Sequence, residues 1–319
     1  MTKPAILAMK SVHPFYLEAL RSEYDVHLNT HNDDPAAFEV LKPQIIGLAA
    51  SGESVVPGAL IEQLPALKVI SVFGVGYDGV DVKTAAARGV GVSHTPDVLT
   101  DDVADLALGL LLATSRSIAR ADQHVRQGAW PKGLLPLARK VSGARLGIVG
   151  FGRIGKAIAK RAAGFDMAIS YTARSEKTDS GYPYVASVVE LARQVDFLVV
   201  ITPGGEGTKH LINAQVLEAL GPQGYLINVA RGSVVDEAAL VHALKEGLIA
   251  GAGLDVFANE PHAPQELWTM PNVVLTPHIA SATVQTRQAM AKLAFSNMQA
   301  GTRGHALLTP VPEMCKAAA

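Results

Sequence analysis

Three side chains suited to acid–base and anion chemistry lie at or just beyond the ends of predicted strands in the second half of the chain. They are Arg231, Glu260 and His278. Ligands of doubly wound parallel sheets bind outside the carboxyl ends of the strands, so we expect these three side chains to share one crevice. Taken alone, each also has a plainer interpretation, as a surface arginine, a turn glutamate or a structural histidine.

With a hydride donor, these three types of side chain can reduce a 2-keto acid. The planar guanidinium of Arg231 can bind the carboxylate and the carbonyl oxygen with more geometric control than a lysine. His278 can protonate that oxygen as hydride reaches the carbon, and it becomes the base in the reverse direction. Glu260, hydrogen-bonded to the other ring nitrogen, would orient the imidazole and favour its protonated form. We therefore predict that these residues are the catalytic group.

A glycine-rich turn is the predicted place for the hydride donor. The apolar strand at 145–149 runs directly into GFGRIG at 150–155. This GxGxxG spacing at the start of a helix is typical of a dinucleotide pyrophosphate site, because the glycines allow close approach and the helix N-terminus favours an anion.

A second sequence, GVGYDG at 74–79, has the same spacing and also follows a strand-like run. Asp78 and Asp81 in and after this earlier turn would repel a pyrophosphate, whereas Arg153 and Lys156 beside the later turn would attract it. Charge therefore selects the later turn.

The strand that follows the glycine turn indicates which nicotinamide nucleotide binds. An acidic residue about 20 positions after the glycines holds the ribose of NAD, and an arginine there accommodates the 2′-phosphate of NADP. The predicted strand at 167–172 is followed by Arg174 and Ser175, with Lys177 close behind, and the first acid is Glu176. We predict NADPH, with NADH as the alternative if Arg174 merely lies on a solvated loop.

Composition limits the class of protein. The chain has 319 residues, 49% of them apolar, and a formal net charge of −1, which is typical of a globular protein of about two domains and argues against a nucleic-acid partner. The longest apolar stretch, 106–113, is too short to span a membrane, and we expect a cytoplasmic protein. One cysteine, Cys315, excludes an intramolecular disulfide and a cysteine metal cluster, and no metal site is predicted.

Alternating strand and helix signals predict an α/β fold with two doubly wound parallel-sheet domains. In the first part, strands are expected at 5–8, 45–49, 68–73 and 90–92. In the second part, strands are expected at 145–149, 167–172, 196–201, 225–229, 251–256 and 272–276. A single long helix is expected at 101–127, and a helix at 283–300 is expected to return to the first domain. The predicted domains are therefore 1–98 with 283–319, and 99–282.

The chain resembles the D-isomer-specific 2-hydroxyacid dehydrogenase family over essentially its full length. The matching motifs lie at 73–81, 150–155, 228–232, 253–257, 260–261 and 277–281. The resemblance implies a Rossmann nucleotide-binding domain, a flavodoxin-like substrate domain, and Arg231, Glu260 and His278 as the catalytic group. It also implies that Asp255 contacts the nicotinamide carboxamide and that the N–H groups of Val75 and Gly76 hold the substrate carboxylate.

Within the family, the chain is most similar to NADPH-dependent hydroxypyruvate, glyoxylate and hydroxyphenylpyruvate reductases. The predicted cofactor-binding residues are Gly150, Phe151, Gly152, Arg153, Ile154, Ala173, Arg174, Ser175, Thr202, Pro203, Val229, Ala230, Arg231, Asp255, His278 and Ser281. The predicted substrate-binding residues are Ser51, Gly52, Val75, Gly76, Arg231, His278 and, from a partner subunit, Trp130.

The resemblance further implies a homodimer joined through the nucleotide-binding domains, in which Trp130 either reaches the partner's site or only anchors the interface. Two other functions stay open. One is a nucleotide-sensing, corepressor-like binding protein of the same fold, and the other is an NAD-dependent D-2-hydroxyacid dehydrogenase with a different substrate.

Overall fold

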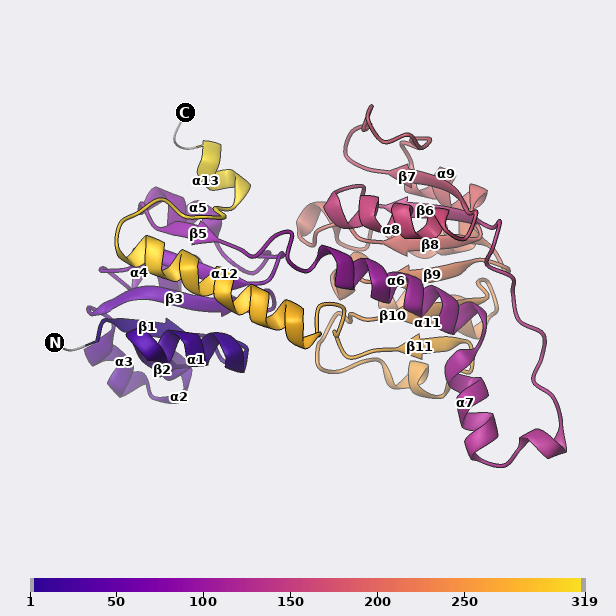
Figure 1. Cartoon of the computed structure of the whole chain (residues 1–319), viewed down its shortest axis with the longest axis horizontal. Helices are drawn as coiled ribbons and strands as arrows, with labels where there is room; N and C mark the ends of the chain where they lie inside the picture. Colours follow the sequence, from indigo (N-terminus) through magenta and orange to yellow (C-terminus); the bar gives the residue numbers. More distant parts are fainter. Residues whose placement is uncertain (1–2, 317–319) are drawn as a thin grey trace. The chain divides into compact units, whose positions relative to one another are not determined.

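The computed structural model describes residues 3–316, and they fold into two compact units. The first unit contains the residues up to Leu99 together with those from Thr283 onward, and the second contains Thr100–Ala282. Each unit is built around one sheet whose paired strands all run parallel, with helices against it (Figure 1).

The sheet of the first unit has the strand order β2-β1-β3-β4-β5 within the described residues. This is the flavodoxin-like order, in which the chain reverses direction across the sheet between β1 and β3. Its strands are β1 (Ala5–Ala8), β2 (Asp25–Leu28), β3 (Ile45–Ser51), β4 (Val69–Phe73) and β5 (Gly91–Ser93). Its helices are α1 (Pro14–Glu23), α2 (Thr30–Asp33), α3 (Pro35–Leu41), α4 (Gly58–Glu62), α5 (Val82–Ala87), α12 (Val284–Thr302) and α13 (Pro312–Lys316).

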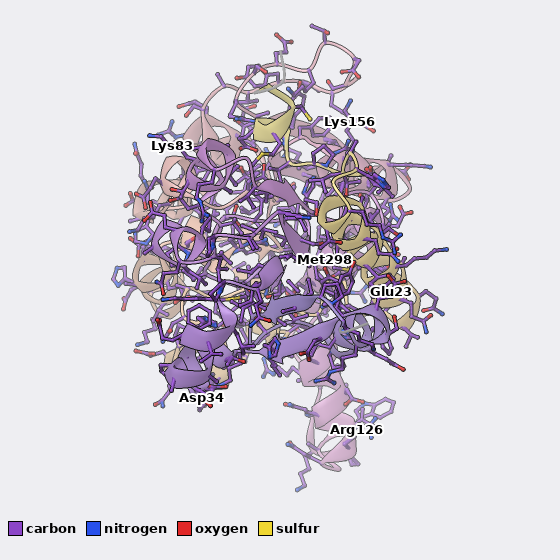
Figure 2. All side chains as sticks on the ribbon, turned by 90° about the vertical axis from the view of Figure 1, so that its left-hand side faces the viewer. Glu23, Asp34, Lys83, Arg126, Lys156 and Met298 are labelled. Atoms are coloured by element: carbon purple, nitrogen blue, oxygen red, sulfur yellow. The ribbon has the colours of Figure 1, made fainter. Side chains whose placement is uncertain are left out.

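Helix α12 packs against α1 and across β3, β4 and β5, so the C-terminal part of the chain completes the first unit. Glycines allow the close approach: a Cβ on Gly47 would meet the sulfur of Met298 at 2.5 Å, and one on Gly301 would meet Val69 at 2.5 Å. Glu23, at the end of α1, lies beside α12 and pairs with Arg303 just beyond it (Figure 2).

The sheet of the second unit has the order β11-β10-β9-β8-β6-β7 within the described residues. Its strands are β6 (Arg145–Val149), β7 (Ala168–Thr172), β8 (Phe197–Val200), β9 (Tyr225–Asn228), β10 (Gly251–Leu254) and β11 (Val273–Leu275). Tyr184 adds one parallel bridge to Tyr171 of β7, where a Rossmann sheet places its third strand, so the order matches that fold with this strand reduced to a single bridge.

The helices of the second unit form two groups, with α6 packed on α8 and with α9, α10 and α11 packed in series. They are α6 (Thr100–Ser115), α7 (Ile118–Arg126), α8 (Arg153–Ala163), α9 (Val188–Gln194), α10 (Ala214–Leu220) and α11 (Glu237–Lys245). Short 3-10 turns are η1 (Trp130–Lys132), η2 (Glu206–Thr208), η3 (Gly232–Val234) and η4 (Gln265–Thr269). Apolar residues of β8, β9 and β10 face those of α9, α10 and α11 in one core, which explains why these strands read as continuous apolar runs.

The expected fold class is confirmed, but two local expectations were wrong. The single helix expected at 101–127 is two helices, because Ser117 adopts a left-handed conformation with φ 52° and ends the first helical path. The edge strand β2, with the sequence DVHL, was not expected, because its alternation of polar and apolar residues extends over only four positions.

No helix within residues 3–316 is both long enough and apolar enough to cross a membrane.

Candidate active site

The loop after β9 is shaped by the side chain of Asn228. Its Oδ1 accepts a hydrogen bond from the N–H of Ala230 at 3.1 Å, and its Nδ2 donates to the carbonyl of Arg231 at 3.1 Å. Asn228 is almost fully buried, so this pair of hydrogen bonds fixes the backbone that carries Arg231. The guanidinium of Arg231 also donates to the carbonyl of Ala230 at 2.7 Å.

Gly232 brings the loop after β9 against the loop after β10. A Cβ placed on Gly232 would lie 1.8 Å from the carbonyl carbon of Phe257, a separation that no side chain tolerates. The N–H of Phe257 in turn donates to Glu260 Oε1 at 2.9 Å. The absence of a side chain at one glycine therefore brings Arg231 and Glu260 into the same neighbourhood.

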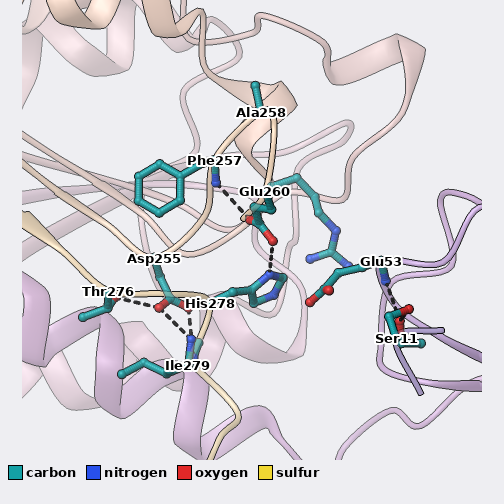
Figure 3. A network of polar contacts seen from close by, with 12 residues as sticks. Ser11, Glu53, Asp255, Phe257, Ala258, Glu260, Thr276, His278 and Ile279 are labelled. Carbon is teal, nitrogen blue, oxygen red and sulfur yellow. Dashed lines mark hydrogen bonds and ion pairs between the residues drawn. The ribbon is translucent and has the colours of Figure 1, made fainter. Parts of the chain in front are cut away.

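Glu260 and His278 form a close pair. His278 Nδ1 lies 2.7 Å from Glu260 Oε2, and Figure 3 shows Glu260 bonded on its other oxygen to the N–H of Phe257. Both side chains are partly exposed, at 27% for His278 and 24% for Glu260. The pair is held in one orientation yet stays accessible, which suits a group that transfers a proton.

A buried carboxylate holds the segment that carries His278. Asp255 is completely buried and accepts hydrogen bonds from Thr276 Oγ1 at 2.6 Å and from the N–H groups of Ile279 and Ala280 at 2.9 Å (Figure 3). The N–H of His278 donates to the carbonyl of Asp255 at 2.8 Å. His278 has φ 53°, a left-handed conformation that costs energy in a non-glycine residue and that these bonds maintain.

The environment shifts the pKa values of both carboxyl groups. Burial alone would raise the pKa of Glu260, but the hydrogen bonds from His278 and Phe257 and the charges of His278 and Arg231 outweigh it and lower the pKa. Burial raises the pKa of Asp255, although its hydrogen-bond donors oppose that shift. Glu260 is therefore a carboxylate at neutral pH and can stabilise a protonated imidazole at His278.

The predicted nucleotide turn has the geometry of an anion site. Gly150 has φ 101°, and a Cβ there would meet the backbone of Ile201 and Thr202 at 2.7–2.8 Å, which places the turn between β6 and β8, where the strand order reverses. A Cβ on Gly152 would meet no described atom within 4 Å, so the surface stays open at the start of α8. No side chain caps this helix and its first turn has no acid, a combination that suits a bound pyrophosphate.

The segment after β7 places an arginine and a serine before its first acid, Glu176. Arg174 and Ser175 are exposed, and Lys177 Nζ lies 3.3 Å from Ser175 Oγ. Phe151 stacks on Tyr171 of β7 with ring centroids 4.1 Å apart, which fixes the turn beside this strand. These side chains fit a 2′-phosphate by their charge and hydrogen-bonding type.

The remaining predicted cofactor residues also follow strand ends. Thr202 and Pro203 follow β8, and Ser281 lies near His278 in the chain, partly exposed. Val229 and Ala230 follow β9 but are buried, so they can offer a ligand little beyond their backbone. Ala173, between β7 and Arg174, is half-buried, and Arg153 and Ile154 open α8.

The predicted substrate residues of the first unit follow β3 and β4. Ser51 ends β3, two residues beyond the strand end expected from the sequence, and the N–H of Gly52 donates to the carbonyl of Phe73 at 3.2 Å. Val75 and Gly76 lie in the turn after β4. After this earlier glycine turn, Asp81 caps α5 by accepting from the N–H of Thr84 at 2.9 Å, so the helix N-terminus is already occupied by a carboxylate.

Trp130 lies in η1, beyond α7, and its side chain is 61% exposed. Figure 1 shows α7 and the segment after it extending away from the sheet of the second unit, and Arg126 near the end of α7 points outward in Figure 2. The role of Trp130 in the site of a partner subunit stays a prediction.

Three contributors to the cluster were not predicted: Asn228, Thr276 and the N–H of Phe257. Asn228 and Thr276 could have been recognised in the sequence, because each is a polar residue at the end of an apolar strand. The Phe257 contact could not, because a backbone donor looks the same in every sequence.

A doubly wound nucleotide-binding unit that also carries an Arg, Glu and His cluster at its strand ends defines a nicotinamide-dependent dehydrogenase class. Comparison with known proteins specifies the family within this class. The chain belongs to the D-isomer specific 2-hydroxyacid dehydrogenase family, whose NAD binding domain model matches residues 108–280. The family expected from the motifs is thereby confirmed.

Individual relatives cover most of the chain. Hydroxyphenylpyruvate reductase of Plectranthus scutellarioides is 54% identical over 79% of this chain and 80% of its own. 2-Ketogluconate reductase of Gluconobacter oxydans is 42% identical over 97% of this chain and 99% of its own. The crystal structure of an NADPH-dependent glyoxylate/hydroxypyruvate reductase from Sinorhizobium meliloti, in complex with NADP and malonate, is 46% identical, covers 98% of each chain and has a TM-score of 0.92.

Proposed function

We propose that the chain is an NADPH-dependent reductase that converts a small 2-keto acid to the D-2-hydroxy acid. The observation that carries this proposal is the 2.7 Å contact between Glu260 and His278, in the unit that also holds the glycine turn. When bound, NADPH supplies the hydride. The unit Thr100–Ala282 is the proposed nucleotide-binding domain, and the other unit is the proposed substrate domain.

Each catalytic residue has a proposed role. Arg231 binds the substrate and draws charge toward its carbonyl oxygen, because a planar guanidinium donates to two oxygens at once. His278 gives the proton to that oxygen from Nε2, because Nδ1 faces Glu260. Glu260 is ionised at neutral pH and keeps the imidazole protonated and oriented.

Three further contacts are proposed from the resemblance and from the geometry. The N–H groups of Val75 and Gly76 hold the substrate carboxylate, in a turn that follows β4 as anion-binding turns follow strand ends. Ser51 and Gly52 form the adjoining wall. Asp255 receives the nicotinamide carboxamide, although its described hydrogen bonds already occupy both carboxylate oxygens.

NADPH is proposed over NADH because no acid precedes Glu176 after β7, whereas Arg174, Ser175 and Lys177 can bind a phosphate. The reductase of Sinorhizobium meliloti, solved with NADP, supports this choice.

The substrate is proposed to be hydroxypyruvate, glyoxylate or an aryl pyruvate, the compounds for which several relatives are named. The similarity to 2-ketogluconate reductase adds a longer polyhydroxylated 2-keto acid to the panel. The test is NADPH oxidation at 340 nm with hydroxypyruvate, glyoxylate, phenylpyruvate, hydroxyphenylpyruvate and 2-ketogluconate. Turnover of at least one supports the proposal, and tight NADPH binding without turnover of any supports a nucleotide-sensing protein instead.

We also propose a cytoplasmic homodimer. Exposed apolar side chains gather on α7, on the segment after it and on η4: Ile118, Val125, Trp130, Leu134, Leu137 and Trp268. A groove of about 540 Å³ lies among α6, α7 and the segment 268–274. Such a surface is typical of an interface between subunits, and Leu134→Asp with Leu137→Asp should halve the mass measured by light scattering.

A further inference from the structure

The proposed carboxylate turn, residues 74–77, presents two N–H groups whose direction decides whether they can bind an anion. Within residues 3–316, neither the N–H of Val75 nor that of Gly76 donates a hydrogen bond to the protein. Both residues are only partly buried. These donors are therefore available to a ligand, provided the turn is held in one conformation.

The segment after β5 holds this turn through three hydrogen bonds. Thr95 N–H donates to the carbonyl of Gly74 at 2.8 Å, and Thr95 Oγ1 accepts from the N–H of Gly74 at 3.0 Å. His94 Nδ1 lies 2.9 Å from the carbonyl oxygen of Val75. A carbonyl oxygen only accepts, so the proton of this bond is on Nδ1 of His94.

The hydrogen bond from His94 also fixes the direction of the Gly76 N–H, because of the geometry of the peptide group. The carbonyl of Val75 and the N–H of Gly76 belong to the same trans peptide and point in opposite directions. When His94 fixes the carbonyl on one side, the N–H of Gly76 must point to the other side. Thr95 does not do this, because its bonds are to the carbonyl and the N–H of Gly74, which belong to the two preceding peptides.

His94 is itself firmly anchored by the C-terminal part of the chain. Its N–H donates to the carbonyl of Thr309 at 3.1 Å, and its carbonyl accepts from Thr309 Oγ1 at 2.6 Å. Asn297 of α12 is fully buried and donates to the same Thr309 hydroxyl at 2.8 Å. The Tyr77 ring also packs on the imidazole in a T-shaped arrangement, with centroids 5.3 Å apart and an interplanar angle of 88°.

We propose that His94 is a positioning residue for substrate binding: its imidazole orients the Val75–Gly76 peptide so that the Gly76 N–H faces the substrate carboxylate. This inference rests on the proposed function. The Nδ1 proton of His94 is committed to the Val75 carbonyl.

Three variants separate the hydrogen bond from packing. His94→Phe keeps an aromatic ring for Tyr77 but has no donor. His94→Asn keeps a donor, because the amide Nδ2 takes nearly the same position as imidazole Nδ1. His305→Ala is the matched control, since His305 is exposed and lies outside the turn.

Steady-state kinetics with hydroxypyruvate, or with the substrate most active in the panel, are measured for all four proteins, together with the inhibition constant of oxamate, an unreactive 2-keto acid analogue. We expect His94→Phe to raise the substrate KM and the oxamate inhibition constant about fivefold to tenfold, the effect expected for the loss of one hydrogen bond. The kcat and the KM for NADPH should stay within about twofold of those of the original protein. His94→Asn should restore at least half of the lost affinity, and His305→Ala should change nothing.

The outcomes are distinguishable. If the original protein reduces no 2-keto acid, the proposed function fails. If it is active and His94→Phe leaves the KM and the oxamate constant unchanged, the inference about His94 fails while the function stands. Equal losses in His94→Phe and His94→Asn, with equal losses in melting temperature, would also overturn it, because the role would then be general packing.

Discussion

The imidazole of His278 and the carboxylate of Glu260 are joined at 2.7 Å, although 18 residues separate them in the chain. The other oxygen of Glu260 is bound by the N–H of Phe257, and the backbone of His278 is bound by the carbonyl of Asp255. The pair is thus tied from both sides to the end of β10. This arrangement fixes the orientation of the imidazole, as a general acid requires.

Replacing His278, the proposed acid, should impair the chemistry far more than nucleotide binding. We expect His278→Ala to lower kcat for keto acid reduction by about 10²–10⁴-fold, the usual contribution of a general acid. NADPH binding, followed by the quenching of protein fluorescence, should change much less. A loss in kcat below about tenfold would exclude His278 as the proton donor.

Replacing Glu260, which is hydrogen-bonded to His278, should change the pH dependence of kcat/KM. The pKa of Glu260 is lowered in the folded protein, so the group is ionised at neutral pH and its charge favours the protonated imidazole. In Glu260→Gln the imidazole should lose its proton at lower pH, and the alkaline limb of kcat/KM for reduction should move toward lower pH. An unmoved limb would show that the Glu260 charge does not act on the acid.

The same lowered pKa has a consequence for stability. A carboxyl group with a depressed folded pKa contributes stability above its unfolded pKa, and this contribution is lost as pH falls through the folded value. The melting temperatures of Glu260→Gln and the original protein should therefore differ most near neutral pH and approach each other in acid. A difference that grows on acidification would contradict this linkage.

The phosphate-binding role of Arg174 should appear as cofactor selectivity. Arg174→Ala should raise the KM for NADPH about tenfold or more and leave the KM for NADH nearly unchanged, because only NADPH carries the 2′-phosphate. Arg193→Ala is a suitable control, since Arg193 is an exposed arginine of α9 that pairs with Glu190. Parallel losses with both nucleotides would mean that Arg174 contacts something other than the phosphate.

Gly232 should be essential to the geometry of the site. A Cβ at this position would collide with the Phe257 backbone, so Gly232→Ala should destabilise the fold by about 1–3 kcal/mol. The variant should also lose more activity than its loss of stability explains, because Arg231 must move. Gly207→Ala is the matched control, since a Cβ at Gly207 meets no described atom within 4 Å. Thermal unfolding and kcat/KM of both variants test this expectation, and similar behaviour of the two would contradict it.

Periodicity and turn signals were sufficient to predict the fold class. The apolar strand before Gly150 and the runs that became β3 and β4 are local patterns that need no tertiary information. The break at Ser117 could not be predicted, because no glycine or proline marks it. There, Ser115 Oγ bonds back to the carbonyl of Leu111, and the N–H of Arg139 reaches the carbonyl of Ser115 from a distant segment.

The types of side chain in the candidate site were also predictable, because Arg231, Glu260 and His278 stand at strand ends where such sheets bind ligands. Their mutual arrangement was not. It depends on the contact between Gly232 and Phe257 and on the bonds of Asp255 to the segment after β11, and these join residues more than 20 positions apart. The catalytic and binding roles themselves stay predictions.

The central claim is best tested by comparing kcat/KM for hydroxypyruvate reduction at saturating substrate with NADPH and with NADH as the varied cosubstrate. We predict measurable reduction with a kcat/KM at least tenfold higher for NADPH, since a phosphate bound by an arginine fork contributes charge-assisted hydrogen bonds that NADH cannot make. A higher value with NADH, or no oxidation of either nucleotide with any 2-keto acid in the panel, would contradict the account.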